Sequence, residues 1–329
     1  MYQKYLKKTV LVFLIILMAL NIQLVYAQDP SLGGGQCYVI ADDGDIFGKV
    51  NTNGSVTWVG PLPAGYRNGE NLAIDPYTGL VYNIAGEESE TPLIIIDPET
   101  LDITEVNPNT SLWDVDALAF NPEDGVLYAV NKYEKFNNEP GILQLVDKNT
   151  GVATKIVDLY FDGAAPTSTG VDPHIDGVAF DPEDGTLYGV YGGWGGPSYL
   201  VFIDMGTGLI TVVGDTGVED IEDISFRWDG VLIGALGDQG RVNGTDFEGL
   251  VVIDKDTSNA SKLGVGYDDP QTRRDVEAFA CMIQKTGNGV RVGGELTPID
   301  SIAVKASKLV VYLVVLLVAT VFVKYGLHR

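Results

Sequence analysis

Two stretches of this chain match at nine of 15 positions: DVDALAFNPEDGVLY at residues 114–128 and HIDGVAFDPEDGTLY at residues 174–188. Weaker copies begin at Glu70 and Glu222, and a fifth begins at Glu277 and soon breaks off. In the best copies an apolar stretch leads into Asp/Asn-Pro-x-x-Gly, a turn in which Pro fixes φ and Gly supplies a positive φ. Counted from the acidic residue of each copy, at 70, 116, 176, 222 and 277, the copies are 46 to 60 residues apart. The pattern therefore predicts a repeat whose unit opens with two strands joined by a tight turn.

Each unit continues with two more apolar stretches. The second strand ends near Tyr82, Tyr128 or Tyr188, and a third strand that finishes in Asp follows after a variable loop. The third strands are predicted at 93–97, 142–147, 200–204 and 250–254. A turn and a fourth strand, such as 152–157 or 209–213, complete the unit. Four short strands in a unit of this length are typical of one blade of a β-propeller.

The two ends of the repeat region complete each other. The last unit has only its first strand, at 276–283, whereas three strands without a first strand occur near the N-terminus, at 37–41, 45–50 and 55–59. One blade would thus combine strands from both ends, which closes the ring and removes open sheet edges. We therefore expect an all-β fold, a five-bladed β-propeller over 28–285.

The repeat resembles those of the YncE-like and NHL-like secreted β-propellers of bacteria and archaea, over about residues 36–283. The stretch DGVAFDPEDGTLY at 176–188 carries the resemblance, and the Gly-His and Trp-Asp signature of WD40 blades is absent from it. The resemblance implies the propeller fold and an extracytoplasmic setting. Members range from binding modules to lactonases, so it implies no single activity.

Residues 1–27 have the pattern of a secretory signal peptide. Lys4, Lys7 and Lys8 precede an apolar run, and Val25-Tyr-Ala27 fits a cleavage site, so the mature chain would begin at Gln28. The alternative is an uncleaved N-terminal anchor.

A second apolar run, 309–323, lies near the C-terminus between basic residues. We expect a linker at 286–304, a transmembrane helix at 305–324 and a cytoplasmic tail at 325–329, because the basic tail agrees with the positive-inside rule. A buried core helix is the alternative. The predicted location is the cell membrane, with a single span and the propeller on the extracytoplasmic side.

The acidic balance excludes one class of partner. Lysine and arginine number 21 against 45 aspartate and glutamate residues, a net charge of −24 at pH 7, and every acidic residue lies within 28–304. Such a field repels nucleic acid, so we expect no DNA or RNA partner.

The chain has two cysteines, Cys37 and Cys281. Alignment of the repeats puts Cys281 at the position of Phe120 and Cys37 at that of Leu127, which flank one hairpin turn. The two cysteines are therefore predicted to be cross-strand neighbours within reach of a disulfide. Two unlinked buried thiols are the alternative.

An acidic residue precedes the first strand of every unit. Because the first strand of a blade lines the central channel, these acids are predicted to surround one channel mouth: Glu70, Asp116, Asp176, Glu222 and Glu277. Crowded carboxylates raise one another's pKa or recruit a cation, and Ca²⁺ is the candidate. Alternatively, each acid accepts backbone N–H groups from the neighbouring blade, or two of them form a catalytic acid pair.

Three further features could contact a ligand. His174 lies two residues before Asp176, and Trp194 lies in the glycine-rich loop 192–196, where an aromatic ring could stack on a sugar or contact a protein. Both have a plain alternative as loop residues. Asn-x-Ser/Thr sequons begin at Asn53, Asn109, Asn243 and Asn259.

No catalytic motif is identified, so the predicted function is a membrane-anchored extracytoplasmic propeller that binds a protein or glycan ligand. A Ca²⁺-dependent hydrolase of lactonase or glycosidase type, using the channel-mouth carboxylates, is the first alternative. A surface-layer or adhesion component is the second.

Overall fold

The computed structural model describes residues 36–290 apart from short gaps, at 42–44, 68, 87–90, 109, 111, 113–114, 132–140, 164–173, 193–195, 228, 268–274, 284 and 287–288. The predicted signal peptide, transmembrane helix and tail, and Trp194, lie outside the described residues. The chain divides into units at 1–292 and 293–329, and the description below concerns the first. Among the described residues no helix is long and apolar enough to cross a membrane.

Three antiparallel sheets have four strands each. The first is β4 (Ala73–Ile74), β5 (Val81–Ile84), β6 (Leu93–Ile96) and β7 (Ile103–Asn107). The second is β8 (Val115–Phe120), β9 (Leu127–Asn131), β10 (Ile142–Val146) and β11 (Ala153–Asp158). The third joins the two ends of the repeat region in the order β21 (Val276–Cys281), β1 (Cys37–Ala41), β2 (Ile46–Val50) and β3 (Val56–Pro61).

A fourth sheet of nine strands contains the remaining repeats. Its main path is β13 (Ile175–Phe180), β14 (Leu187–Tyr191), β15 (Pro197–Ile203), β16 (Leu209–Phe226), β17 (Leu232–Val242), β19 (Leu250–Ile253) and β20 (Ala260–Leu263). β12 (Tyr160–Phe161) pairs with β16, and β18 (Thr245–Asp246) pairs with β17. The first part of β16 pairs with β15 and its last part with β17, so one long strand belongs to two successive repeats.

A separate pair, β22 (Lys285–Thr286) and β23 (Gly289–Val290), follows β21. Most of this pair falls within the segment that the sequence predicts to be a linker, 286–304. Thr286 pairs with Gly289, and Lys285 pairs with Val290.

The repeated turn forms as its residues dictate. The N–H of Gly125 donates to the carbonyl of Asn121, and the Asn121 Oδ1 accepts the N–H of Glu123. Gly125 has a φ of 70°, which a residue with a side chain rarely adopts. The turn beginning at Asp181 has the same two hydrogen bonds. Each turn therefore fixes the hairpin between the first and second strands of its repeat.

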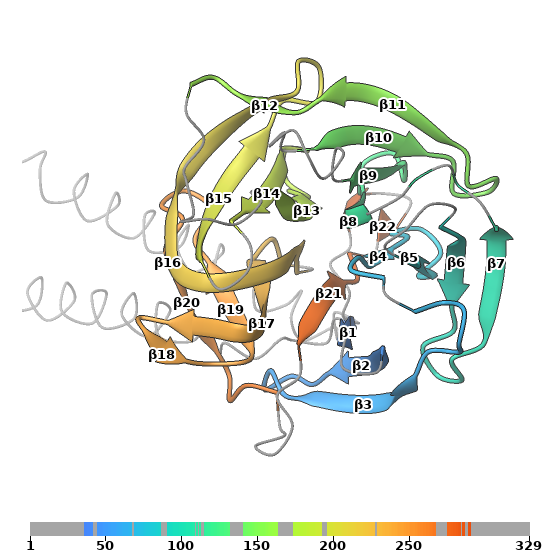
Figure 1. Ribbon diagram of the computed structural model, residues 1–329, viewed down its shortest axis with the longest axis horizontal. Coiled ribbons are helices and arrows are strands. Elements are labelled where there is room, and N and C mark those ends of the chain that lie inside the picture. The colour runs from blue at the N-terminus through green and yellow to red at the C-terminus, as the bar shows by residue number, and fades with distance from the viewer. Residues whose placement is uncertain are drawn as a thin grey trace, which may run out of the picture. The chain divides into compact units, whose positions relative to one another are not determined.

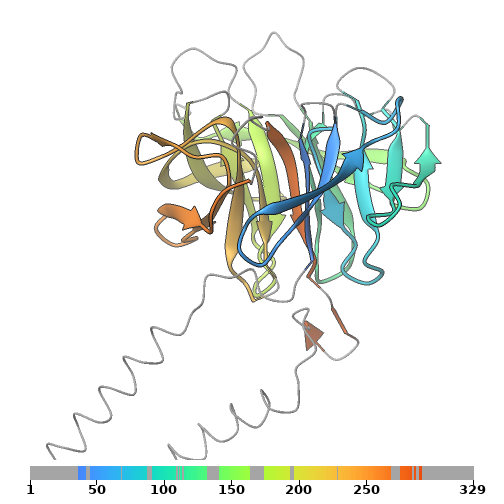
Figure 2. The ribbon, with the colours of Figure 1, turned by 90° about the horizontal axis from the view of Figure 1, so that it is seen from below.

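The sheets surround a common centre, the arrangement of a β-propeller (Figure 1). The innermost strands contact one another in a closed circuit: β4 with β8, β8 with β13, β13 with the end of β16, β16 with β21, and β21 with β4. In the perpendicular view of Figure 2, the orange strand β21 lies beside the blue N-terminal strands. A cavity of about 40 Å³ on the axis is lined by the small residues of these strands, Ala73, Ala119, Ala179, Ser225 and Ala280. Small side chains at these positions let the strands converge.

Neighbouring repeats pack through a recurring aromatic pair. The tyrosine of the second strand contacts the phenylalanine that ends the next inner strand, with ring centroids 5.2 to 5.8 Å apart. These pairs are Tyr82–Phe120, Tyr128–Phe180 and Tyr188–Phe226. The repeated sequence therefore determines the contact between successive repeats as well as the strands within each repeat.

The predicted disulfide between Cys37 and Cys281 is confirmed. The two residues face each other in the β1–β21 ladder, as Phe120 faces Leu127 in β8–β9. The bond therefore fastens the two ends of the repeat region within one sheet.

Candidate functional site

The acids predicted from the repeat lie at irregularities of the inner strands. The pairing register shifts around Asp116 in β8, around Asp176 in β13 and around Glu222 in β16. In the β1–β21 ladder the register skips Glu277 in the same way. Such a bulge adds one residue to a strand and redirects its side chain. Four of the five acids are thus the extra residues of bulges, and the fifth, Glu70, precedes β4 and is partly buried.

The inner strands approach each other closely at these bulges. A Cβ on Gly177 would lie 2.6 Å from the Cα of Asp223 and 2.8 Å from the N of Ile224, so only glycine fits beside the neighbouring strand. Asp176 and Glu222, one residue earlier on each strand, are brought together by this approach. The negative charge of Asp176 raises the pKa of Glu222, as expected for two neighbouring carboxylates.

Glu222 is at the centre of the electrostatic cluster. Burial raises the pKa of this carboxyl well above its ordinary value, and the charges of Glu277, Asp176 and Asp220 raise it further. Burial also raises the pKa of Asp223, with a smaller contribution from Asp176, although its carboxylate accepts the N–H groups of Phe279 and Ile224 at 2.8 and 2.7 Å. This end of the inner strands therefore resists the accumulation of negative charge.

A second row of polar side chains lies two residues before the first. His174 Nε2 is 2.7 Å from Asp176 Oδ1, and Asp220 and Asp275 occupy the corresponding positions before Glu222 and Glu277. His174 is therefore placed beside a channel-mouth acid, where it orients one of its oxygens.

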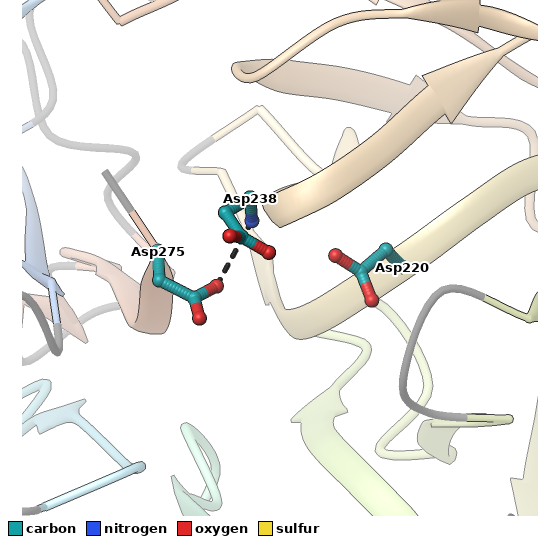
Figure 3. A group of neighbouring side chains, drawn as sticks. All are labelled: Asp220, Asp238 and Asp275. Carbon is teal, nitrogen blue, oxygen red and sulfur yellow. Dashed lines mark hydrogen bonds between the residues drawn. The ribbon is translucent and has the colours of Figure 1, made fainter. Parts of the chain in front are cut away.

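Asp220, Asp238 and Asp275 form a compact group, with one carboxylate oxygen of each within 4.8 Å of the others (Figure 3). The N–H of Asp238 donates to Asp275 Oδ1 and that of Gln239 to Asp220 Oδ2, both at 2.9 Å. Burial, followed by the charges of Asp238 and Asp220, raises the pKa of Asp275 to about 6. The group has the oxygen donors that a hard cation such as Ca²⁺ requires.

Gly237 allows this group to assemble. A Cβ there would lie 2.7 Å from Asp275 Oδ1, 2.8 Å from Asp220 Oδ2 and 3.0 Å from Cγ of Glu222. The backbone of β17 at Gly237 can therefore approach the side chains of Asp220, Glu222 and Asp275 only because this residue has no side chain.

Sequence reasoning identified the first row but missed Asp220, Asp238 and Asp275. A signal existed for two of them, because Asp-Ile-Glu at 220–222 and Asp-Val-Glu at 275–277 repeat the His-Ile-Asp spacing of 174–176. Asp238 had none, since it reaches the group from the extension of β17.

Part of the alternative interpretation also applies, but to neighbouring residues. Asp223 accepts the N–H of Phe279 from the next inner strand. Asn71, the corresponding residue after Glu70, donates to the carbonyls of Ile84 and Val115 at 2.9 Å. Residues that follow the channel-mouth acids therefore tie one inner strand to the next. Asp116 is itself buried, at 3% exposure.

No protein-family model matches the chain, and no curated protein sequence matches it. It is similar to a chain of a nidogen–laminin complex at 10% identity and a TM-score of 0.45, over 77% of this chain and 99% of that one. TolB from Acinetobacter baumannii is similar at 13% identity and a TM-score of 0.42, over 75% of this chain and 66% of that one. A protein of unknown function from Bacteroides thetaiotaomicron is similar at 16% identity and a TM-score of 0.45, over 74% and 60% respectively. All three are β-propeller proteins. At such low scores the fold assignment rests on the sheets of the chain itself, and the YncE-like or NHL-like assignment stays a prediction.

Proposed function

We propose that this chain is an extracytoplasmic, five-bladed β-propeller that is tethered to the cell membrane by a helix over 305–324. In this proposal the channel-mouth acids receive a positively charged group of a protein partner. The bulged acids carry the proposal, because their mutual repulsion would be relieved by a cation from outside.

The blade count is inferred by dividing the nine-stranded sheet at β16. Its first part completes a unit with β13, β14 and β15, and its last part begins a unit with β17, β19 and β20. Four repeats then supply one four-stranded blade each, and the fifth blade combines β21 with β1, β2 and β3 from the N-terminal end. The closed circuit of inner-strand contacts supports this division.

The disulfide supports the proposed location. Bonds of this kind persist in oxidising compartments and are rare in the cytosol. A signal peptide over 1–27 and a basic tail at 325–329 would place the propeller outside and the tail inside, in agreement with the positive-inside rule.

A basic side chain is the ligand group that best matches the channel mouth. Asp176 is 5% exposed, and its Oδ2 makes no hydrogen bond to the residues that the structure describes, while the charges of three other carboxylates act on Glu222. A lysine or arginine could donate hydrogen bonds to these oxygens and offset their charge. Ca²⁺ would compete for the same oxygens, and a glycan ligand would depend less on charge.

Binding of a lysine octapeptide to the full chain in detergent tests the proposal, with and without Ca²⁺. We expect Asp176→Asn and Glu222→Gln each to weaken peptide binding at least fivefold, and Asp162→Asn, an exposed acid after β12, to leave it unchanged. Equal binding by all four proteins would contradict the channel mouth as the site. If the wild type binds Ca²⁺ but not the peptide, the ligand of these acids is a metal ion and the proposed basic side chain is wrong.

One observation favours a hydrolase as a second candidate. Asp275, with a pKa raised to about 6 beside Asp220 and Asp238, could hold a proton near neutral pH and deliver it as a general acid. Ca²⁺-dependent turnover of lactone or glycoside substrates that is lost in Asp275→Asn would support it. Loss of cell adhesion on deletion, without turnover, would instead favour the adhesion alternative.

A further inference from the structure

Three of the four sequons lie on described turns at the outer side of the propeller. Asn243 is at the tip of the β17–β18 hairpin, Asn259 precedes β20, and Asn53 precedes β3. All three asparagines are exposed. In Figure 1, β3, β18 and β20 lie on the outside of the ring of sheets.

The hairpin that contains Asn243 is an addition to the repeated pattern. β17 continues beyond its pairing with β19 and turns back into β18, with Val242 opposite Thr245. Asn243 and Gly244 have φ values of 54° and 69°, as a two-residue hairpin turn requires. The turn accounts for Asn243 and Gly244, but it does not require the hydroxyl of Thr245.

The three sequons differ in the exposure of their serine or threonine residue. Thr245 and Ser261 are exposed, whereas Ser55 is 5% exposed and its Oγ is 2.8 Å from Asn53 Oδ1. An enzyme that reads both the asparagine and the hydroxyl on the folded chain could therefore reach the sequons of Asn243 and Asn259. It could not reach that of Asn53 without opening the β2–β3 turn.

From this geometry we propose that Asn243 and Asn259 carry N-linked glycans and that Asn53 does not. The proposal rests on the extracytoplasmic location proposed above. A membrane oligosaccharyltransferase would form a bond between the asparagine Nδ2 and the anomeric carbon of a sugar. The bond from that carbon to the phosphate of a lipid-linked donor breaks, the lipid phosphate leaves, and the amide loses one proton.

Glycans at these positions would suit the fold. Asn259 directly precedes β20, the outer strand of its sheet, and such edge strands can pair with other chains. A bulky hydrophilic group beside the edge hinders that pairing. Both sites belong to the sheet segment of β17, β19 and β20, in which β20 is the last strand.

The test is peptide mass spectrometry of the full chain purified from the cells that make it, together with three variants. Thr245→Val removes the hydroxyl but keeps the shape of a strand residue, Thr245→Ser keeps the sequon, and Ser261→Ala removes that of Asn259. We expect a sugar mass on the Asn243 peptide of the wild type and Thr245→Ser, and its loss in Thr245→Val. Ser261→Ala should lose only the Asn259 glycan.

Unmodified Asn243 and Asn259 in chains whose Cys37–Cys281 peptides are linked and whose surface can be labelled on intact cells would overturn this inference alone. Chains retained inside the cell would overturn both it and the proposed location. A glycan on Asn53 without one on Asn243 would refute the accessibility argument.

Discussion

At the end of the inner strands where the Asp-Pro turns lie, Asp75 and Asp181 are buried, and each forms an ion pair with a lysine of the next repeat. Lys148 Nζ is 2.6 Å from Asp75 Oδ2, and Lys255 contacts Asp181. At the opposite end, Glu222 has other acidic residues as neighbours, among them Asp176 and Asp220. Burial opposes ionisation at both ends, but the hydrogen bond from Lys148 keeps the pKa of Asp75 below its ordinary value, whereas burial and neighbouring acids raise that of Glu222.

The repeat shows that the turn end is built for stability. At the two positions of the ion pair, the intervening repeat has Asn121 and Met205 in place of aspartate and lysine. Both charges are thus replaced together, as expected because a single buried charge without its partner is costly. The acidic end follows no such rule, which is consistent with a role in binding rather than in holding the sheets together.

The largest effect should come from opening the ring at the disulfide. Cys281→Ser removes a crosslink that spans 244 residues, and we expect a loss of about 4 kcal/mol in the free energy of unfolding. Denaturant unfolding of the oxidised wild type and the variant measures it. Reduced wild type is the control and should match the variant; a loss below about 1 kcal/mol would show that sheet pairing alone closes the ring.

Breaking one ion pair at the turn end should come next. Lys255→Met leaves the Asp181 carboxylate buried without its lysine, and we expect a loss of about 2–3 kcal/mol, since the lysine side chain is 28% exposed. The double variant Asp181→Asn/Lys255→Met copies the Asn121/Met205 arrangement and should recover most of this loss in denaturant unfolding. A double variant as unstable as the single one would mean that the pair is not a unit.

The fold could be predicted from sequence because the repeat states it several times. Pro and Gly determine the turn between the first two strands of the best copies, and the Tyr–Phe pairs make the contact between successive repeats. The weaker copies could therefore be aligned on the stronger ones. The register of Cys37 against Cys281 followed from that of Leu127 against Phe120. The hairpin of β17 and β18 could not be predicted, because it belongs to one repeat only.

The site was harder to predict than the fold. Alignment gave the first row of acids, but bulges depend on how neighbouring strands approach, as at Gly177 and Asp223. The role of Gly237 depends on three carboxylates from two other segments. Such a contact has no periodic signal, and Asp238 was missed for that reason.

A smaller effect of opposite sign is expected at the acidic end. Glu222→Gln removes a group that resists ionisation, so the variant should be more stable than the wild type at pH 8, by about 1 kcal/mol. Thermal unfolding in EDTA measures it, with Asp162→Asn as a control for loss of one surface charge. Destabilisation by Glu222→Gln would show that the carboxylate makes a stabilising bond that outweighs its repulsion.

The smallest effect distinguishes the two ends by pH. Asp275 has a pKa of about 6 in the folded chain, above its ordinary 3.8, so the folded state binds more protons than the unfolded state in that interval. Stability from this group is therefore present below pH 4 and is lost as the pH rises through 6. Asp75 behaves in the opposite way, because its pKa is lowered in the folded chain. Its contribution to stability is present when the pH is above the ordinary aspartate pKa, and it is lost as the pH falls through the lowered pKa. Asp275→Asn should thus gain on the wild type between pH 4 and 7, on the order of 1 kcal/mol because the side chain is partly exposed. Denaturant unfolding in EDTA at pH 4 and at pH 7 measures the gain. A difference in the free energy of unfolding between the two proteins that is the same at both pH values would mean that Asp275 titrates normally and is not repelled by neighbouring acids.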